Sequence, residues 1–80
     1  LKGGFLMFDV IKSLLKTNDH VVINFSDSSS REIKKIERYP KNLDILVGTD
    51  TANFLIYFST DKIVTVIPDA HTTHINPLNI

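Results

Sequence analysis

The chain contains no cysteine and only three glycines, and its nine basic and nine acidic side chains cancel to a formal charge of zero. Without cysteine, disulfides and thiolate metal sites are excluded, which suits a reducing cytosol. The balanced charge counts against a large phosphate-binding surface, because dedicated nucleic-acid binders carry an excess of positive charge. No apolar run approaches the length of a membrane span. We therefore expect a cytoplasmic protein with no membrane contact.

The length of 80 residues allows one small domain. Such a domain buries a modest fraction of its surface and is only marginally stable alone. Many small domains add disulfides, a metal or a partner subunit. Since disulfides are excluded here, we expect the chain to associate with copies of itself.

Three short runs of β-branched and aromatic residues fill the second half of the chain: Leu43–Val47, Phe54–Phe58 and Ile63–Ile67. A few small or polar residues separate them, a spacing typical of an antiparallel meander. Both faces of the middle run are apolar. In a sheet with one face exposed to solvent, apolar and polar residues would alternate more regularly along the strand. We therefore expect the second face to be covered by a helix, by barrel closure or by another copy.

The first half of the chain begins with a helical pattern and continues with a strand. Met7–Lys16 is predicted to be a helix, because its apolar residues fall on one stripe. The members of the stripe are Phe8, Ile11, Leu14 and Leu15. His20–Ser26 is predicted to be the first strand, followed by the polar turn Asp27–Ser30.

The segment Arg31–Tyr39 fits two structures. As a helix it would begin with a capping box at Ser29 and Glu32 and end before Pro40. As a strand it breaks period two between Ile33 and Ile36, and one bulged residue between Lys34 and Lys35 would repair the alternation. We favour the bulged strand, because the first strand needs a neighbour and a hairpin supplies one. A second helix at 30–39 is the alternative.

The two ends of the chain are set apart from the domain at 7–69. Lys2-Gly3-Gly4 can be encoded by a ribosome-binding sequence, and Met7 follows at a typical start spacing. We expect residues 1–6 to be disordered or a translated leader, which a native peptide containing Gly3-Gly4 would contradict. Residues 70–80 lack periodicity and are predicted to be a flexible tail. Asp69, His71 and His74 could bind a metal, but nothing nearby would hold them rigid, so we expect no metal and no cofactor.

Two segments resemble the Sm-like small barrels. Asp44–Tyr57 reads DILVGTDTANFLIY, and its ending looks like the fourth strand of that fold. Ile63–Pro68 looks like the fifth strand, which also ends at a proline, and Arg38–Asn42 occupies the place of an aromatic-containing turn. Over Phe8 to Asp69 the chain resembles the Hfq family of bacterial Sm-like RNA chaperones. The resemblance implies a mainly β (α+β) fold, with an N-terminal helix and a five-stranded, strongly bent antiparallel SH3/Sm-like barrel, and a ring assembly.

The chain departs from the Hfq pattern where that family binds RNA. The family follows its tyrosine with lysine and histidine, and here Phe58 and Ser59 stand in those places. An Asn-Gly-type turn is replaced by Asp27–Ser30, and Lys35 stands near the glycine at the bend of the second strand. Other SH3-like barrels match the same short motifs almost as well.

Candidate residues follow from these patterns. A basic cluster beside Tyr39 could pair phosphate contacts with an aromatic platform. The candidate RNA-binding residues are Lys35, Arg38, Tyr39, Lys41 and Tyr57. The candidate oligomer-interface residues are Phe54, Ile56, Phe58, Ile63 and Thr65. No nucleophile with a nearby base is evident, so we expect no enzyme.

Two functions remain open from the sequence. The first is an Sm-like RNA-binding protein that acts as an oligomeric ring on single-stranded RNA. The alternative is a small protein-interaction or regulatory module of bacterial or phage origin that binds a protein partner and no nucleic acid. The zero net charge and the lost lysine–histidine pair favour the alternative.

Overall fold

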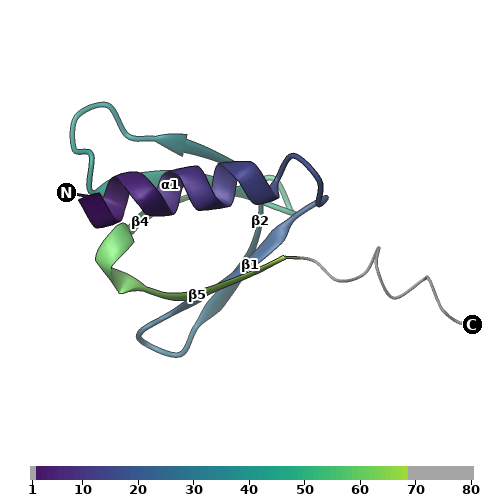
Figure 1. Cartoon of the computed structure of the whole chain (residues 1–80). Helices are drawn as coiled ribbons and strands as arrows, with labels where there is room; N and C mark the ends of the chain where they lie inside the picture. The colour runs from purple at the N-terminus through teal and green to yellow at the C-terminus, as the bar shows by residue number, and fades with distance from the viewer. Residues whose placement is uncertain (1, 69–80) are drawn as a thin grey trace, which may run out of the picture.

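The computed structural model describes residues 2–68, and the side chains of residues 6–68. The element order is α1 (Lys2–Leu14), β1 (Val21–Phe25), β2 (Ser30–Arg38), β3 (Ile45–Asp50), β4 (Leu55–Ser59), η1 (Thr60–Lys62) and β5 (Ile63–Pro68). The five strands form one antiparallel sheet in the order β4-β3-β2-β1-β5. Figure 1 shows α1 lying along one side of the curved sheet. This architecture confirms the predicted mainly β class with one N-terminal helix.

The ambiguous segment is a strand, so the alternative second helix at 30–39 is wrong. Ile33 pairs with Asp50 and Lys35 pairs with Thr49, which leaves Lys34 as an extra residue in β2. This bulge lies where the spacing of the isoleucines breaks period two. It turns both Ile33 and Ile36 towards the core, where they are 0% and 4% exposed. The predicted bulged strand is confirmed.

The sheet curls so strongly that strands far apart in its order touch. β1 and β4 are separated by β2 and β3, which in a flat sheet would hold them about 14 Å apart. Yet the rings of Phe25 on β1 and Phe58 on β4 meet edge to face, with centroids 5.2 Å apart. A register shift between Asn24 and Phe25 of β1, opposite β5, adds to the irregularity. Figure 1 shows the resulting curvature.

The expected meander of three strands is wrong at its last step. β3 and β4 pair as expected, but β5 pairs with β1 at the other end of the sheet. The turn η1 separates β4 from β5 and redirects the chain. As a result β4 and β5 are the two edges of the sheet.

The helix covers the core from one side. It packs against β2 and η1, and Ile11 on its predicted stripe is fully buried. It ends at Leu14, whose carbonyl accepts a hydrogen bond from Asn18 Nδ2 at 2.9 Å. It begins at Lys2 rather than at Met7. The leader hypothesis for residues 1–6 concerns translation and stays a prediction.

The core is entirely apolar within the described part of the chain. Its buried members are Ile11, Val21, Ile23, Ile33, Ile36, Leu46 and Phe58. No helix in residues 2–68 is long and apolar enough to cross a membrane. The flexible tail at 70–80 and the candidate metal ligands Asp69, His71 and His74 lie outside the described residues.

Candidate nucleic-acid interface

A groove of about 250 Å³ lies between α1 and β2 and is lined mainly by lysines. We call it the lysine groove; its lining residues are Lys12, Leu15, Lys16, Lys34, Lys35, Ile36 and Glu37. Four of the nine basic residues of the chain therefore meet in one place, with one acidic residue. A chain with no net charge thus carries a locally basic surface, and surfaces of this kind attract anionic groups.

Local structure explains why the four lysines meet. Lys12 lies in the last turn of α1, and Lys16 follows in the turn that ends the helix, where its backbone N donates a hydrogen bond to Ser13 O at 3.2 Å. On β2, the bulge keeps Lys34 and Lys35 together between two isoleucines that both face the core. Packing of α1 against β2 then brings the two pairs to one groove.

These lysines keep their charges available. No ion pair joins any of the four to an acidic side chain within residues 6–68. Lys12 lies over the ring of Phe8, with Nζ 5.6 Å from the ring centroid. Lys12, Lys16 and Lys35 are exposed and Lys34 is half-buried. An anion in the groove would meet cations that are not already neutralised.

The far end of β2 carries a pair of tyrosines. Tyr39 follows β2 and meets Tyr57 of β4 edge to face, with ring centroids 5.8 Å apart and an interplanar angle of 89°. Tyr57 is 59% exposed, because it lies on the outer face of the sheet opposite Val47. Its partner fixes its ring while the remaining surface stays open, as a stacking platform for a nucleobase requires.

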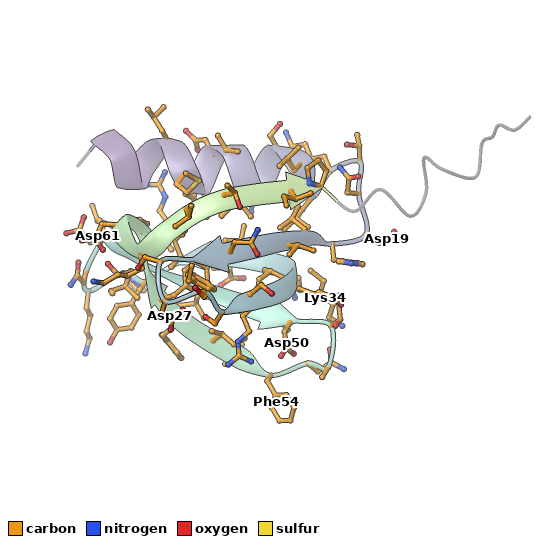
Figure 2. The ribbon with its side chains drawn as sticks, turned by 90° about the horizontal axis from the view of Figure 1, so that it is seen from below. Asp19, Asp27, Lys34, Asp50, Phe54 and Asp61 are labelled. Carbon is orange, nitrogen blue, oxygen red and sulfur yellow. The ribbon has the colours of Figure 1, made fainter. Side chains whose placement is uncertain are left out.

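The outer face of β3 and β4 is unusually apolar for a solvent-facing surface. Leu55 is 60% exposed near Tyr57, and Phe54, which precedes it, is 68% exposed. Leu43, before the start of β3 at the opposite end of the pair, is 64% exposed. Figure 2 shows Phe54 projecting away from the sheet. Exposed apolar residues of this kind that lie together mark a surface of contact with other molecules.

Arg38 faces α1 rather than the tyrosines. Its guanidinium carbon lies 4.5 Å from the centroid of the Phe8 ring, and Nη2 is 3.9 Å from Oδ1 of Asp9. Alternation after the bulge places Arg38 on the same side of β2 as Ile36. It therefore holds the helix to the sheet.

Of the five candidate RNA residues, the structure brings Tyr39 and Tyr57 together and puts Lys35 in the lysine groove. Lys41 is exposed in the turn after Tyr39, which is closed by a hydrogen bond from Asn42 N to Tyr39 O at 3.2 Å. The candidate residues predicted from the sequence do not include Lys12 and Lys16, which also line the groove. Their i, i+4 spacing beside the apolar stripe is the signal that could have found them.

The candidate interface residues divide between the core and the surface. Phe58 is buried, and Ile56 and Ile63 are half-buried against the core. Phe54 and Thr65 are exposed, and the Thr65 hydroxyl Oγ1 accepts a hydrogen bond from Asn24 Nδ2 at 2.7 Å. Contacts between copies at these strands would therefore use the backbone edges and the outward side chains. Those side chains are Leu55, Tyr57, Val64 and Ile67.

The turn between β1 and β2 holds an ionised carboxylate. Ser29 donates two hydrogen bonds to Oδ1 of Asp27, from Oγ at 2.6 Å and from the backbone N at 2.9 Å. The side-chain bond first, and then the backbone bond, lower the pKa of Asp27 below its usual value of 3.8. Since the folded pKa is depressed, the stabilisation is present above pH 3.8 and is lost as the pH falls through the folded value.

This lowered pKa predicts a measurable titration. Carboxyl chemical shifts followed by NMR are expected to place the midpoint of Asp27 below 3.8. Ser29→Ala removes the side-chain donor but keeps the backbone one, so the midpoint should rise part of the way back. A midpoint that Ser29→Ala leaves unchanged would contradict the assignment of the shift to the hydroxyl.

No group of three or more His, Cys, Asp or Glu side chains within the described residues could hold a metal ion. What the interface offers is binding chemistry: cations in a groove at the bulge of β2, and an aromatic pair beyond the end of that strand. The chain matched no protein-family model, no curated protein and no solved structure.

Proposed function

We propose that the chain is an Sm-like RNA-binding protein that acts as an oligomeric ring on single-stranded RNA in the cytoplasm. The observation that supports this best is that two complementary features lie at the bulge and beyond the end of β2. The lysine groove lies at its bulge, and the tyrosine pair lies at its end. Phosphates would bind the lysines while a base stacks on Tyr57.

The distance between the two features suits a flexible strand. Lys35 and Tyr39 are four residues apart on extended backbone, which spans about 13 Å. A short stretch of single-stranded RNA covers that distance and still presents its bases, whereas a duplex would hide them. Lys41, exposed in the following turn, would contact the next phosphate.

The edges of the sheet support the assembly. Neither β4 nor β5 carries a charged residue, and the outward side chains Leu55, Tyr57, Val64 and Ile67 are apolar and exposed. Such edges favour pairing with another chain. Because the two edges differ, β4 of one copy would pair with β5 of the next, and a head-to-tail contact closes into a ring when the rotation permits.

Light scattering behind size-exclusion chromatography tests both parts of the proposal in one experiment. We expect a species several times the 9.0 kDa chain mass, with excess absorbance at 260 nm when the protein is purified without nuclease. Titration of the nuclease-treated protein into fluorescein-labelled single-stranded RNA should then give saturable binding that weakens with salt. A monomer that leaves the labelled RNA unbound at low salt would refute the proposal.

The protein-interaction module remains the alternative, because of the exposed apolar face of β3 and β4. It predicts a monomer or dimer free of nucleic acid that retains one stable protein partner in a pull-down. Leu55→Lys, at the exposed start of β4 beside Phe54, should release such a partner. The same change would leave the lysine groove intact.

A further inference from the structure

A second cavity, of about 400 Å³, lies between the β1–β2 turn, β4 and η1. We call it the mouth cavity; the lining residues used below are Phe25, Asp27, Arg31, Ile56, Phe58 and Lys62. Figure 2 places Asp27, which lines it, towards the opposite side of the molecule from Lys34 of the lysine groove. The two sites are therefore separate.

The apolar wall of the mouth cavity belongs to the packed core. Phe25 and Phe58 meet edge to face at 5.2 Å, and Phe58 is 9% exposed. Ile56 and Phe25 are half-buried against the same core. The wall is therefore formed before any ligand arrives, and the volume lies within the range of small-molecule sites, about 300–1,000 Å³.

Arg31 occupies a position that alternation reserves for an apolar residue. It pairs with Ile23 of β1 and lies two residues before Ile33, and both isoleucines are fully buried. Period two therefore puts Arg31 on the concave side of the sheet, at its open end. No acidic side chain within residues 6–68 forms an ion pair with it. Its charge attracts Asp27, whose pKa it helps to lower, but the exposed guanidinium remains open to a ligand.

Lys62, at the end of η1, supplies a second cation to the lining of the mouth cavity. Its carbonyl accepts a hydrogen bond from Ser26 N at 2.8 Å, which ties η1 to the β1–β2 turn and fixes the position of its backbone. Asp27 is the one carboxylate among the residues lining the cavity, and Ser29 holds it through Oδ1. Two cations against one anion leave one net positive charge beside an apolar wall.

We propose that the mouth cavity binds a small carboxylic acid with an apolar body. The carboxylate lies between Arg31 and Lys62, and the body packs against Phe25, Ile56 and Phe58. Asp27 repels a second negative charge, so the site selects a monoanion over a phosphate ester or a polyphosphate. This binding requires neither RNA nor assembly of the chain, so it can be tested independently of the proposed function.

Amide NMR spectra of the full chain, titrated with hydrocinnamate as the probe, test the proposal. We expect saturable shifts at Phe25, Arg31, Phe58 and Lys62. The neutral amide of the same acid should bind at least about tenfold more weakly, because it forfeits the charge-assisted hydrogen bonds. Equal binding of acid and amide, no saturable shifts, or shifts centred on the exposed Leu55 would overturn the proposal.

Matched variants locate the site. Arg31→Gln/Lys62→Gln should weaken hydrocinnamate binding about tenfold or more, and both side chains are exposed, so the fold is kept. Lys16→Gln/Lys35→Gln removes two exposed cations from the lysine groove and should leave hydrocinnamate binding unchanged. Asp27→Asn should admit phenyl phosphate, which the native chain rejects. If both double variants weakened hydrocinnamate binding equally, the attraction would be non-specific and the proposed site would be rejected.

The same titration distinguishes two sources of the carboxylate. Gly-Gly-Phe presents an apolar residue with a free terminal carboxylate, as the end of a protein chain does. If it binds more tightly than hydrocinnamate, and its terminal amide does not bind, the ligand is the carboxyl end of a peptide. Tighter binding of hydrocinnamate assigns the site to a free small acid. Failure of both acids to bind would overturn the proposal.

Discussion

Gly48→Ala is expected to destabilise the fold by about 1–3 kcal/mol, the cost of overpacking a core. A Cβ at Gly48 would lie 3.0 Å from Ile33 Cδ1, 3.2 Å from Ile33 Cγ2 and 3.2 Å from Phe58 Cε1. Both neighbours belong to the buried core and have little space to move. The total stability of a domain of this length is only about 4–12 kcal/mol, so urea unfolding would detect the loss easily.

The expected loss of stability has the opposite sign to the usual effect of replacing a glycine in a strand. Alanine in place of glycine within an ordinary strand gains about 0.5–1 kcal/mol, because glycine loses more conformational freedom on folding. Thr49→Val, at the next residue and on the outer face, is the control and should change the free energy of unfolding by less than about 0.5 kcal/mol. A more stable Gly48→Ala variant would mean that Ile33 and Phe58 do not pack over β3 as described.

The strands of this fold could be predicted because their apolar residues alternate and polar turns separate them. The predicted strand His20–Ser26 contains β1, and the predicted runs beginning at Leu43, Phe54 and Ile63 overlap β3, β4 and β5, which extend to Asp50, Ser59 and Pro68. Even the bulge could be predicted, because two isoleucines three residues apart cannot both face the core of a regular strand. Each of these features depends on neighbouring residues alone.

The partner of β5 could not be predicted in the same way. Adjacency in the chain favours pairing with β4, and the run Ile63–Ile67 is apolar enough to pair with either edge. The turn η1 directs β5 away from β4 and towards β1. In this turn the hydroxyl of Ser59 donates a hydrogen bond to Asp61 Oδ1 at 2.5 Å, and Thr60 N donates one to Asp44 O at 2.9 Å. Such a turn redirects the strand, and its residues carry no strong signal of their own.

The candidate site was predicted only in part for a similar reason. The sequence predicts both Tyr39 and Tyr57 as RNA-binding residues, and their rings meet because β2, β3 and β4 are neighbours in the sheet. The lysine groove forms only when α1 packs against β2 in one particular position along the strand. No local sequence pattern predicts that position. The sequence predicts Arg38 as an RNA-binding residue. Its position beside Phe8 depends on the packing of α1 against β2, which the sequence alone does not reveal.

If the lysine groove binds phosphates, Lys16→Gln/Lys35→Gln will weaken RNA binding about 10- to 100-fold at moderate salt. The variant removes one exposed cation from the turn after α1 and one from β2. Each lost phosphate contact should reduce the slope of log affinity against log salt by about 0.7 for a single strand, so the slope should fall by about 1.4. Fluorescence anisotropy with labelled single-stranded RNA at several salt concentrations measures both quantities. Arg31→Gln/Lys62→Gln removes the same charge elsewhere and should change neither.

Tyr57→Leu separates stacking from charge in the same assay. Leucine keeps an apolar side chain on β4 but loses the aromatic face, and stacking of one base is worth about 1–3 kcal/mol. Affinity should therefore fall while the salt slope stays unchanged, the opposite pattern to that of a lysine variant. If Tyr57→Leu and the lysine double both left the affinity intact, RNA would bind elsewhere and the alignment along β2 would have no functional meaning. If both reduced the slope alike, the tyrosine would be acting through assembly of the ring, because a stacking contact releases no counterions.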